Sequence, residues 1–191
     1  MLKVCSWLES TTKNPAKNGI KYWCQDETRL GLKTRESKVI TALGVKPKGF
    51  VQWNFKSYYI YGAIAPKSGE SFFLEFSHLD GDCFQIFLDH LSQSYPSYLN
   101  IIQLDNGLFH AGSKLKIPDN ILLIFQPPYS PELNPIERVW HYFKQHLRWE
   151  IYQDIEQLKD KVRSVIEGFY PEIIASLTGW DYILEALATV A

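Results

Sequence analysis

Three acidic residues of this chain, Asp26, Asp105 and Glu137, have sequence positions that a fold could bring together. Asp26 lies in an alternating segment, residues 20–32, on the face that carries the apolar side chains. Asp105 directly follows the apolar run 101–104, where a predicted strand ends. Glu137 stands at the start of a predicted late helix, after a loop rich in proline.

Carboxylates that meet at one spot would repel one another, and their charge must be offset. Divalent cations with oxygen ligands provide that offset. A pair of such cations suits in-line displacement at phosphorus, because one ion assists the attacking oxygen and the other the leaving oxygen. The three acids therefore predict a site that holds divalent cations and acts on a phosphate ester.

Each acid also has a purely structural interpretation. Asp26 either pairs with an arginine or lies beyond the buried stretch, because an isolated buried carboxylate is costly. Asp105 begins an Asp-Asn-Gly sequence that is typical of a plain turn. Glu137 closes a capping box with Asn134, with Pro135 at the first helical position. The individual sequence contexts leave these alternatives open.

Most other catalytic signatures are absent from the sequence. It has no G-x-S-x-G, H-E-x-x-H, P-loop or G-x-G-x-x-G pattern. The three cysteines and five histidines do not fall at zinc-ligand spacings. The prediction of what chemistry the chain performs therefore rests on the three carboxylates.

The elements that must position these acids follow from the hydrophobic pattern. Strands are predicted within residues 20–32, 58–65, 71–76, 101–104 and 121–125. Tight connections make the first three antiparallel, and crossovers make the last two parallel. The first is expected to be a half-buried strand. We therefore expect an α/β fold, a mixed sheet of about five strands flanked by helices. If its first and fourth strands are neighbours, the two aspartates lie side by side.

Composition supports one globular domain without a membrane span. The chain has 191 residues, 46% hydrophobic and 21% charged, with a net charge of −1. No apolar run reaches 18 residues, and we recognise no signal peptide, so we expect a cytoplasmic protein with reduced thiols. The net charge argues mildly against a protein that only binds nucleic acid.

Four segments carry a family resemblance. They are WCQDETRLGL at residues 23–32, YIYGAIAPKSGE at 59–70, LDNGLFH at 104–110 and QPPYSPELNPIERVW at 126–140. In this order they resemble the DDE transposases of mariner-type bacterial insertion sequences, and the likeness spans about residues 20–147.

The resemblance implies a ribonuclease-H-like fold and cut-and-paste chemistry on DNA. Water would cleave a strand, and the freed 3′-hydroxyl would then attack target DNA. The family's catalytic and metal-binding acids fall on Asp26, Asp105 and Glu137, and two Mg²⁺ or Mn²⁺ ions are implied. Asn106 and His110 are placed near the site. The implied partners are element ends and target DNA, with a homodimer as the active complex on the bacterial nucleoid.

Two features depart from the family pattern. Asp105 and Glu137 have 31 residues between them, a few fewer than is usual, which indicates a trimmed connection at residues 112–118. No upstream helix-turn-helix fits in residues 1–19, which we interpret as a linker or the remnant of a DNA-binding region. Residues 20–191 would then be the catalytic domain with C-terminal helices. The chain would be either the second frame of a frameshifted element, partnered by the product of the upstream frame, or a decayed copy.

Two further groups of residues are candidates for DNA contacts. His141, Lys144 and Arg148 follow Glu137 at helical spacing, so they form either a phosphate-binding stripe or an ordinary solvated face. An aromatic group either packs in the core, which we favour, or stacks on unpaired bases. Its members are Trp53, Phe55, Tyr58, Tyr59 and Tyr61.

Two other functions compete with transposition. One is a structure-specific nuclease of the same fold, against which the proline-rich loop argues. The other is an inactive remnant that only binds DNA or partner subunits, against which the three intact acids argue.

Overall fold

A computed structural model gives the arrangement of the chain. It describes residues 19–34, 38–105, 107, 115–128, 130, 133–181 and 184–185. The elements within these residues are β1 (Ile20–Gly31), β2 (Ser57–Ile64), β3 (Ser71–Phe76), α2 (Gly81–Ser94), β4 (Leu99–Leu104), β5 (Ile121–Phe125), α3 (Ile136–Gln145), α4 (Ile155–Glu167) and α5 (Pro171–Thr178).

The described residues form one five-stranded sheet in the order β3-β2-β1-β4-β5. β1 and β2 pair antiparallel, as do β2 and β3. β1 and β4 pair parallel, as do β4 and β5. The predicted mixed sheet is confirmed, and its first and fourth strands are neighbours. β1 and β4 therefore run in the same direction, with Asp26 in the middle of the longer β1 and Asp105 directly after the end of β4.

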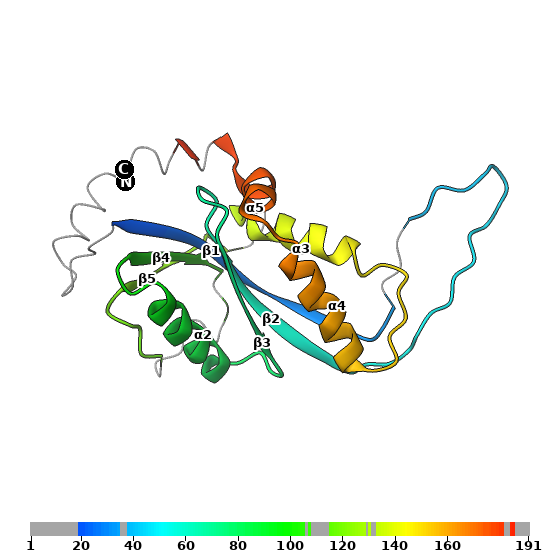
Figure 1. Ribbon diagram of the computed structural model, residues 1–191, viewed down its shortest axis with the longest axis horizontal. Coiled ribbons are helices and arrows are strands. Elements are labelled where there is room, and N and C mark those ends of the chain that lie inside the picture. The colour runs from blue at the N-terminus through cyan, green and yellow to red at the C-terminus, as the bar shows by residue number, and fades with distance from the viewer. Residues whose placement is uncertain are drawn as a thin grey trace.

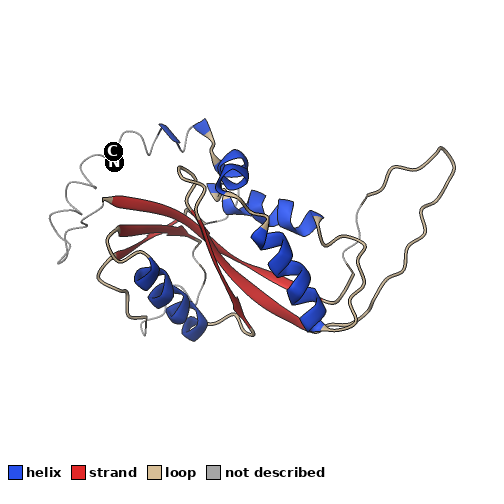
Figure 2. Ribbon diagram, viewed as in Figure 1, coloured by secondary structure: helices blue, strands red, loops and turns tan. Residues whose placement is uncertain are grey.

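Helices cover both faces of the sheet (Figure 1; Figure 2). α2 packs on one face, where Phe84 and Phe87 join Trp23 and Tyr61 in one apolar cluster. α3, α4 and α5 lie on the other face, and their apolar residues form a second cluster with Cys24 and with others of β1 and β2. Successive side chains of a strand point to opposite faces of the sheet, so the same strands contribute apolar side chains to both clusters.

β1 is buried on both faces in its middle, not on one face as expected. Trp23 and Gln25 alternate with Asp26 and so lie on the opposite face of β1, where a half-buried strand would expose them, yet both are completely buried. The reason is the position of β1 as the central strand of the sheet, between two helical layers. The predicted apolar stripe of α3 is confirmed, because Ile136, Trp140 and Phe143 are all buried.

Residues 38–56 form a long loop between β1 and β2 that we call the arm. It projects from the end of the sheet, away from the helices (Figure 1). Its base is held by Gln52, whose backbone N–H donates to Thr34 Oγ1 at 2.8 Å and whose side-chain amide donates to the carbonyl of Tyr152 at 2.9 Å. Beyond this base, residues 38–51 are exposed.

No helix among the described residues combines the length and apolar character that a membrane span requires.

Candidate active site

Asp26 lies in the middle of β1, opposite Gly62 of β2. Its side chain is partly buried beneath α3, and Trp140 Nε1 donates to its Oδ2 at 2.9 Å. The observed partner is therefore the indole of a helix that covers β1, whereas the structural interpretation proposed an arginine. A buried indole N–H needs an acceptor, and this carboxylate supplies it.

Burial raises the pKa of Asp26 from 3.8 to about 8. The negative charges of Glu27 and Glu137 raise this pKa further, whereas hydrogen bonds from the Glu27 backbone and from Trp140 lower it. Glu137 is thus near enough to Asp26 to act on it electrostatically. Asp26 therefore keeps its proton to a higher pH than an exposed aspartate does.

The pairing of β1 with β4, continued past its last pair, aligns Asp105 with Asp26. The two strands are parallel, and Cys24 is aligned with Gln103. If this register is continued for two more residues along both chains, Asp26 is aligned with Asp105. Asp105 is exposed just after β4, and its Oδ1 accepts from the backbone N–H of Gly107 at 2.9 Å. The turn interpretation is thus correct for its local geometry, and it is compatible with a position next to Asp26.

Glu137 lies in the first turn of α3 and is exposed. The predicted capping box is wrong, because the helix has Pro135 at its N-cap and no side-chain capping bond. Asn134 is buried and uses its amide elsewhere, since Nδ2 donates to the carbonyl of Gln25 at 2.9 Å. The residue expected to cap α3 therefore binds the start of the helix to β1, next to Asp26.

The loop before α3 is also fixed to β4. Gln103 Nε2 donates to the carbonyl of Leu133 at 3.0 Å. Hydrogen bonds from Gln103, Asn134 and Trp140 thus fasten α3 and the loop before it to the two strands that carry the aspartates. Glu137 lies between Asn134 and Trp140 along the chain, so these bonds determine its distance from β1.

The three acids come from neighbouring elements, but they do not form a closed set of ligands. Among the described residues, no three His, Cys, Asp or Glu side chains are grouped closely enough to hold a metal ion. The assignment of Asp26, Asp105 and Glu137 as catalytic and metal-binding residues therefore remains a prediction. Asn106 and His110 lie outside the described residues.

The predicted phosphate stripe is shorter than expected. α3 ends at Gln145, so Arg148 lies beyond the helix and does not continue its face. His141 is exposed and Lys144 is partly buried. The stripe is interrupted because the backbone leaves the helical conformation, with Trp149 at a φ of 60°.

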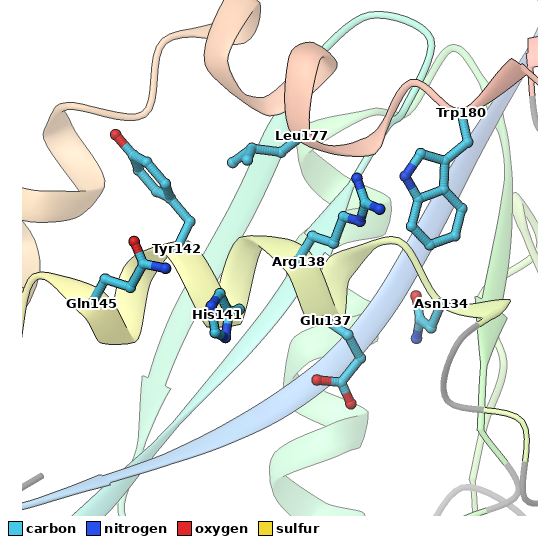
Figure 3. A pocket seen from close by; sticks show the side chains of 8 residues that line it. All are labelled: Asn134, Glu137, Arg138, His141, Tyr142, Gln145, Leu177 and Trp180. Atoms are coloured by element: carbon cyan, nitrogen blue, oxygen red, sulfur yellow. The ribbon is translucent and has the colours of Figure 1, made fainter. Parts of the chain in front are cut away.

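A pocket of about 500 Å³ lies between α3 and the chain around Leu177 and Trp180. Glu137 and His141 are among its lining residues, but neither aspartate is. Figure 3 shows Arg138 pointing toward Trp180 and Glu137 pointing away from both. Because Asp26 and Asp105 do not line it, we place the candidate site at the ends of β1 and β4 and not in this pocket.

Sequence reasoning missed the role of Trp140 and of Gly62. A Cβ at Gly62 would lie 2.6 Å from Trp140 Cη2, so glycine is needed for the indole to reach Asp26. One signal was available in the sequence: Trp140 follows Ile136 at helical spacing, so its indole N–H would be buried and need an acceptor, and Asp26 was predicted on an apolar face, where it needs a donor.

Comparison with known proteins identifies the family. A model of the DDE superfamily endonucleases matches residues 21–159. The uncharacterized protein y4pE/y4sA of Sinorhizobium fredii is 36% identical over 102 residues, which are 52% of this chain and 76% of that protein.

Two solved structures of the Mos1 transposase are similar in fold. The paired-end complex with the left transposon end has a TM-score of 0.64, and the mariner paired end complex with Mn has a TM-score of 0.65. In both, the identity is 14%, and the match covers 93% of this chain but only 56% of the Mos1 chain. The chain therefore belongs to the DDE superfamily endonucleases, and its mixed sheet with helices on both faces is similar to the ribonuclease-H-like fold of the Mos1 transposase.

Proposed function

We propose that this chain is the catalytic domain of a DNA transposase that cleaves DNA strands and joins them to target DNA. Asp26, Asp105 and Glu137 would hold two divalent cations, Mg²⁺ or Mn²⁺. Bound there, these cations would stabilise the attacking and leaving oxygens of an in-line displacement at phosphorus. One of the similar Mos1 structures is a complex with Mn. Carboxylate oxygens are the ligands that both cations favour.

One observation carries the proposal: the parallel pairing of β1 with β4, whose register, continued two residues beyond Cys24 and Gln103, supports a position of Asp105 near Asp26. In sheets with parallel strands, ligands bind beyond the carboxyl ends of those strands. The electrostatic effect of Glu137 on Asp26 places the third acid near the same end. The donor set consists of carboxylates from three separate elements, which fits an oxygen-bound divalent cation.

The other residues of the site act by positioning. Trp140 holds Asp26 Oδ2 through its indole N–H, so the carboxylate has a defined orientation. Asn134 holds the start of α3 against β1, which limits the movement of Glu137 relative to Asp26. A site assembled in this way costs little reorganisation when phosphate approaches, because its parts are already fixed by hydrogen bonds.

The proposed substrates are the ends of a mobile element and its target DNA, in a homodimer on the bacterial nucleoid. The Mos1 structures are of paired-end complexes, one with the left transposon end. This chain spans 56% of the Mos1 chain, so end recognition by a separate segment or by the product of an upstream frame belongs to the proposal. Residues 1–19 as linker or remnant stay a prediction.

The experiment is strand cleavage of a plasmid carrying the element ends, with Mg²⁺ or Mn²⁺ against EDTA. The protein is this chain together with whatever upstream region the element encodes. Wild type should cleave only with the cation, and Asp105→Asn should reduce cleavage by at least about a hundredfold. The matched control is Asp119→Asn, the same substitution at an exposed turn before β5.

A second readout separates loss of the site from loss of the fold. A cation that binds only the folded chain raises its melting temperature. Millimolar Mg²⁺ should therefore raise the melting temperature of wild type and Asp119→Asn, and raise that of Asp105→Asn less. Cleavage that persists in Asp105→Asn at the wild-type rate would overturn the proposed site.

A further inference from the structure

The side-chain amide of Gln103 is hydrogen-bonded at both of its ends. Gln103 lies on β4, two residues before Asp105. Its Oε1 accepts from the hydroxyl of Tyr22, and its Nε2 donates to the carbonyl of Leu133 at 3.0 Å. Tyr22 belongs to β1, and Leu133 to the loop that leads to Glu137. One amide therefore joins both aspartate-bearing strands to the loop before α3.

The two partners fix the orientation of this amide. The carbonyl of Leu133 can only accept, so it must face the nitrogen of Gln103, and the amide oxygen is then turned toward Tyr22. With the amide reversed, two oxygens would face each other at Leu133. The ring of Tyr22 packs against Leu99 and Ile101 of β4, which holds its hydroxyl in place as the donor.

A second link joins the same loop to β1. Asn134 Nδ2 donates to the carbonyl of Gln25 at 2.9 Å. Asn134 directly follows Leu133, so two adjacent residues of the loop are bound to two different strands. The β1 link lies next to Asp26, and the β4 link lies two residues before Asp105. The β4 link is therefore the one that bears on the separation between α3 and the second aspartate.

We propose that Gln103 and Tyr22 are positioning residues of the proposed active site. By holding the loop before α3 to β4, they set the distance between Asp105 and Glu137 that Mg²⁺ requires. Gln103 acts through Leu133, and Tyr22 acts through Gln103. The proposal rests on the proposed function for the cation and its ligands. Groups that orient the ligands of a metal ion typically contribute about ten- to hundredfold to its affinity or to activity.

This role predicts an effect on the choice of cation. Mg²⁺ demands nearly ideal octahedral geometry, whereas the larger Mn²⁺ accepts less regular coordination. Carboxylates that are held less exactly should therefore lose Mg²⁺ before they lose Mn²⁺. A general loss of stability would weaken the binding of both cations alike, so the preference between them separates positioning from folding.

The first measurement is the melting temperature of the full 191-residue chain against the concentration of Mg²⁺ and of Mn²⁺. Gln103→Met keeps the length of the side chain and removes both hydrogen bonds. The Mg²⁺ concentration at which the melting temperature begins to rise should increase at least about tenfold, and the Mn²⁺ concentration less than about threefold. The control is Gln85→Met on α2, because the amide of Gln85 also bonds a distant backbone at both ends, that of Lys116 at 2.9 and 2.7 Å. It should leave both concentrations unchanged.

Tyr22→Phe removes only the hydroxyl. It should raise the required Mg²⁺ concentration about fivefold, the usual effect of one hydrogen bond, and should add nothing in a protein that already carries Gln103→Met. Its control is Tyr152→Phe, whose lost hydroxyl donates to Glu150 Oε2 at 2.8 Å, away from this loop. If Gln103→Met melts too early to be measured, Tyr22→Phe with the same comparison of cations decides.

The second measurement is amide hydrogen exchange in EDTA. The backbone N–H groups of Glu137 and Arg138 each donate to a carbonyl at 3.1 Å in the first turn of α3. They should exchange faster in Gln103→Met, because the start of α3 is released from β4, and at the wild-type rate in Gln85→Met. Faster exchange with an unchanged preference between the cations would make the link merely structural and would overturn the proposal, as would no change in either.

The remaining outcomes separate this proposal from the proposed function. A changed preference between the cations in Gln103→Met, without DNA cleavage by the wild type, would support positioning and overturn transposition. DNA cleavage by the wild type with an unchanged preference in Gln103→Met would do the reverse. A wild-type melting temperature that responds to neither cation would overturn both.

Discussion

Asp26→Asn should change how stability depends on pH in EDTA. The pKa of Asp26 is about 8 in the folded chain and near 3.8 when it is not buried. Between these values the folded chain binds a proton that the unfolded chain releases. The free energy of unfolding therefore decreases as the pH rises from about 4 to about 8, because the proton bound by Asp26 in the folded chain is progressively lost.

The size of the effect follows from this difference in pKa. When only the folded state binds the proton, each pH unit changes the free energy of unfolding by about 1.4 kcal/mol. Between pH 5 and pH 7 this change is therefore at most about 2.7 kcal/mol. Asp26 is only partly buried, and solvent reduces the effect, so we expect about 1 to 2 kcal/mol. Asparagine is neutral at all pH values and retains an oxygen for the Trp140 N–H. Asp26→Asn should thus match wild type only below about pH 4, and its advantage in stability over wild type should grow steadily from pH 5 to pH 8.

The assay is urea unfolding of wild type, Asp26→Asn and Asp119→Asn at pH 5, 6, 7 and 8. Subtracting the variant from wild type removes the contribution of every other titrating group. Asp119→Asn should follow wild type, because it is exposed on a turn. Parallel pH profiles for wild type and Asp26→Asn would show that Asp26 titrates normally, and the account of its burial beneath α3 would be wrong.

Two other substitutions test the parts around Asp26. Glu137→Gln should change the free energy of unfolding by less than about 0.5 kcal/mol, because the side chain is exposed and makes no capping bond. It should nevertheless lower the rate of DNA cleavage at least about a hundredfold. The control is Glu172→Gln, in the first turn of α5, and a fully active Glu137→Gln protein would remove Glu137 from the site. Gly62→Ala should destabilise the fold by about 1 to 3 kcal/mol, because its Cβ would meet the rings of Trp140 and Phe73 at 2.6 and 2.8 Å. Gly168→Ala, whose Cβ would approach only a backbone oxygen at 3.3 Å, is the control in urea unfolding, and equal stability of the two variants would contradict the close packing at Gly62.

Much of the sheet was predictable because strand patterns are local. Alternation and apolar runs located all five described strands, and the short turn between β2 and β3 predicted their antiparallel pairing. The tight connection expected between the first two strands is wrong, because β1 and β2 pair antiparallel across a long loop. Asp26 could be placed on the α3 face of β1 by counting residues in twos. Asp105 could be placed at the end of its strand, and the register then aligns the two aspartates.

The predictions that were wrong concern contacts between segments that lie far apart in the sequence. Asn134 has the residue type of a helix cap, but its Oδ1 is 3.5 Å from the backbone N of Ile136, and its Nδ2 donates to the Gln25 carbonyl, a long-range bond of which the local sequence carries no sign. Trp53 and Phe55 have the residue types of a core, yet the arm leaves both exposed. The helical face that was to include Arg148 ends early because α3 stops at Gln145.

The distance along the chain between the parts of the site imposes an order on synthesis. Trp140 follows Asp26 by 114 residues, and Asn134 follows Gln25 by 109. At about 5 to 20 residues per second, a ribosome needs roughly 6 to 23 s to pass from Asp26 to Trp140. During that interval β1 can pair with β2, but its other edge stays open until β4 is made. A growing chain therefore cannot assemble the proposed site until Trp140 has been translated, so the three acids stay apart during most of the synthesis of the sheet.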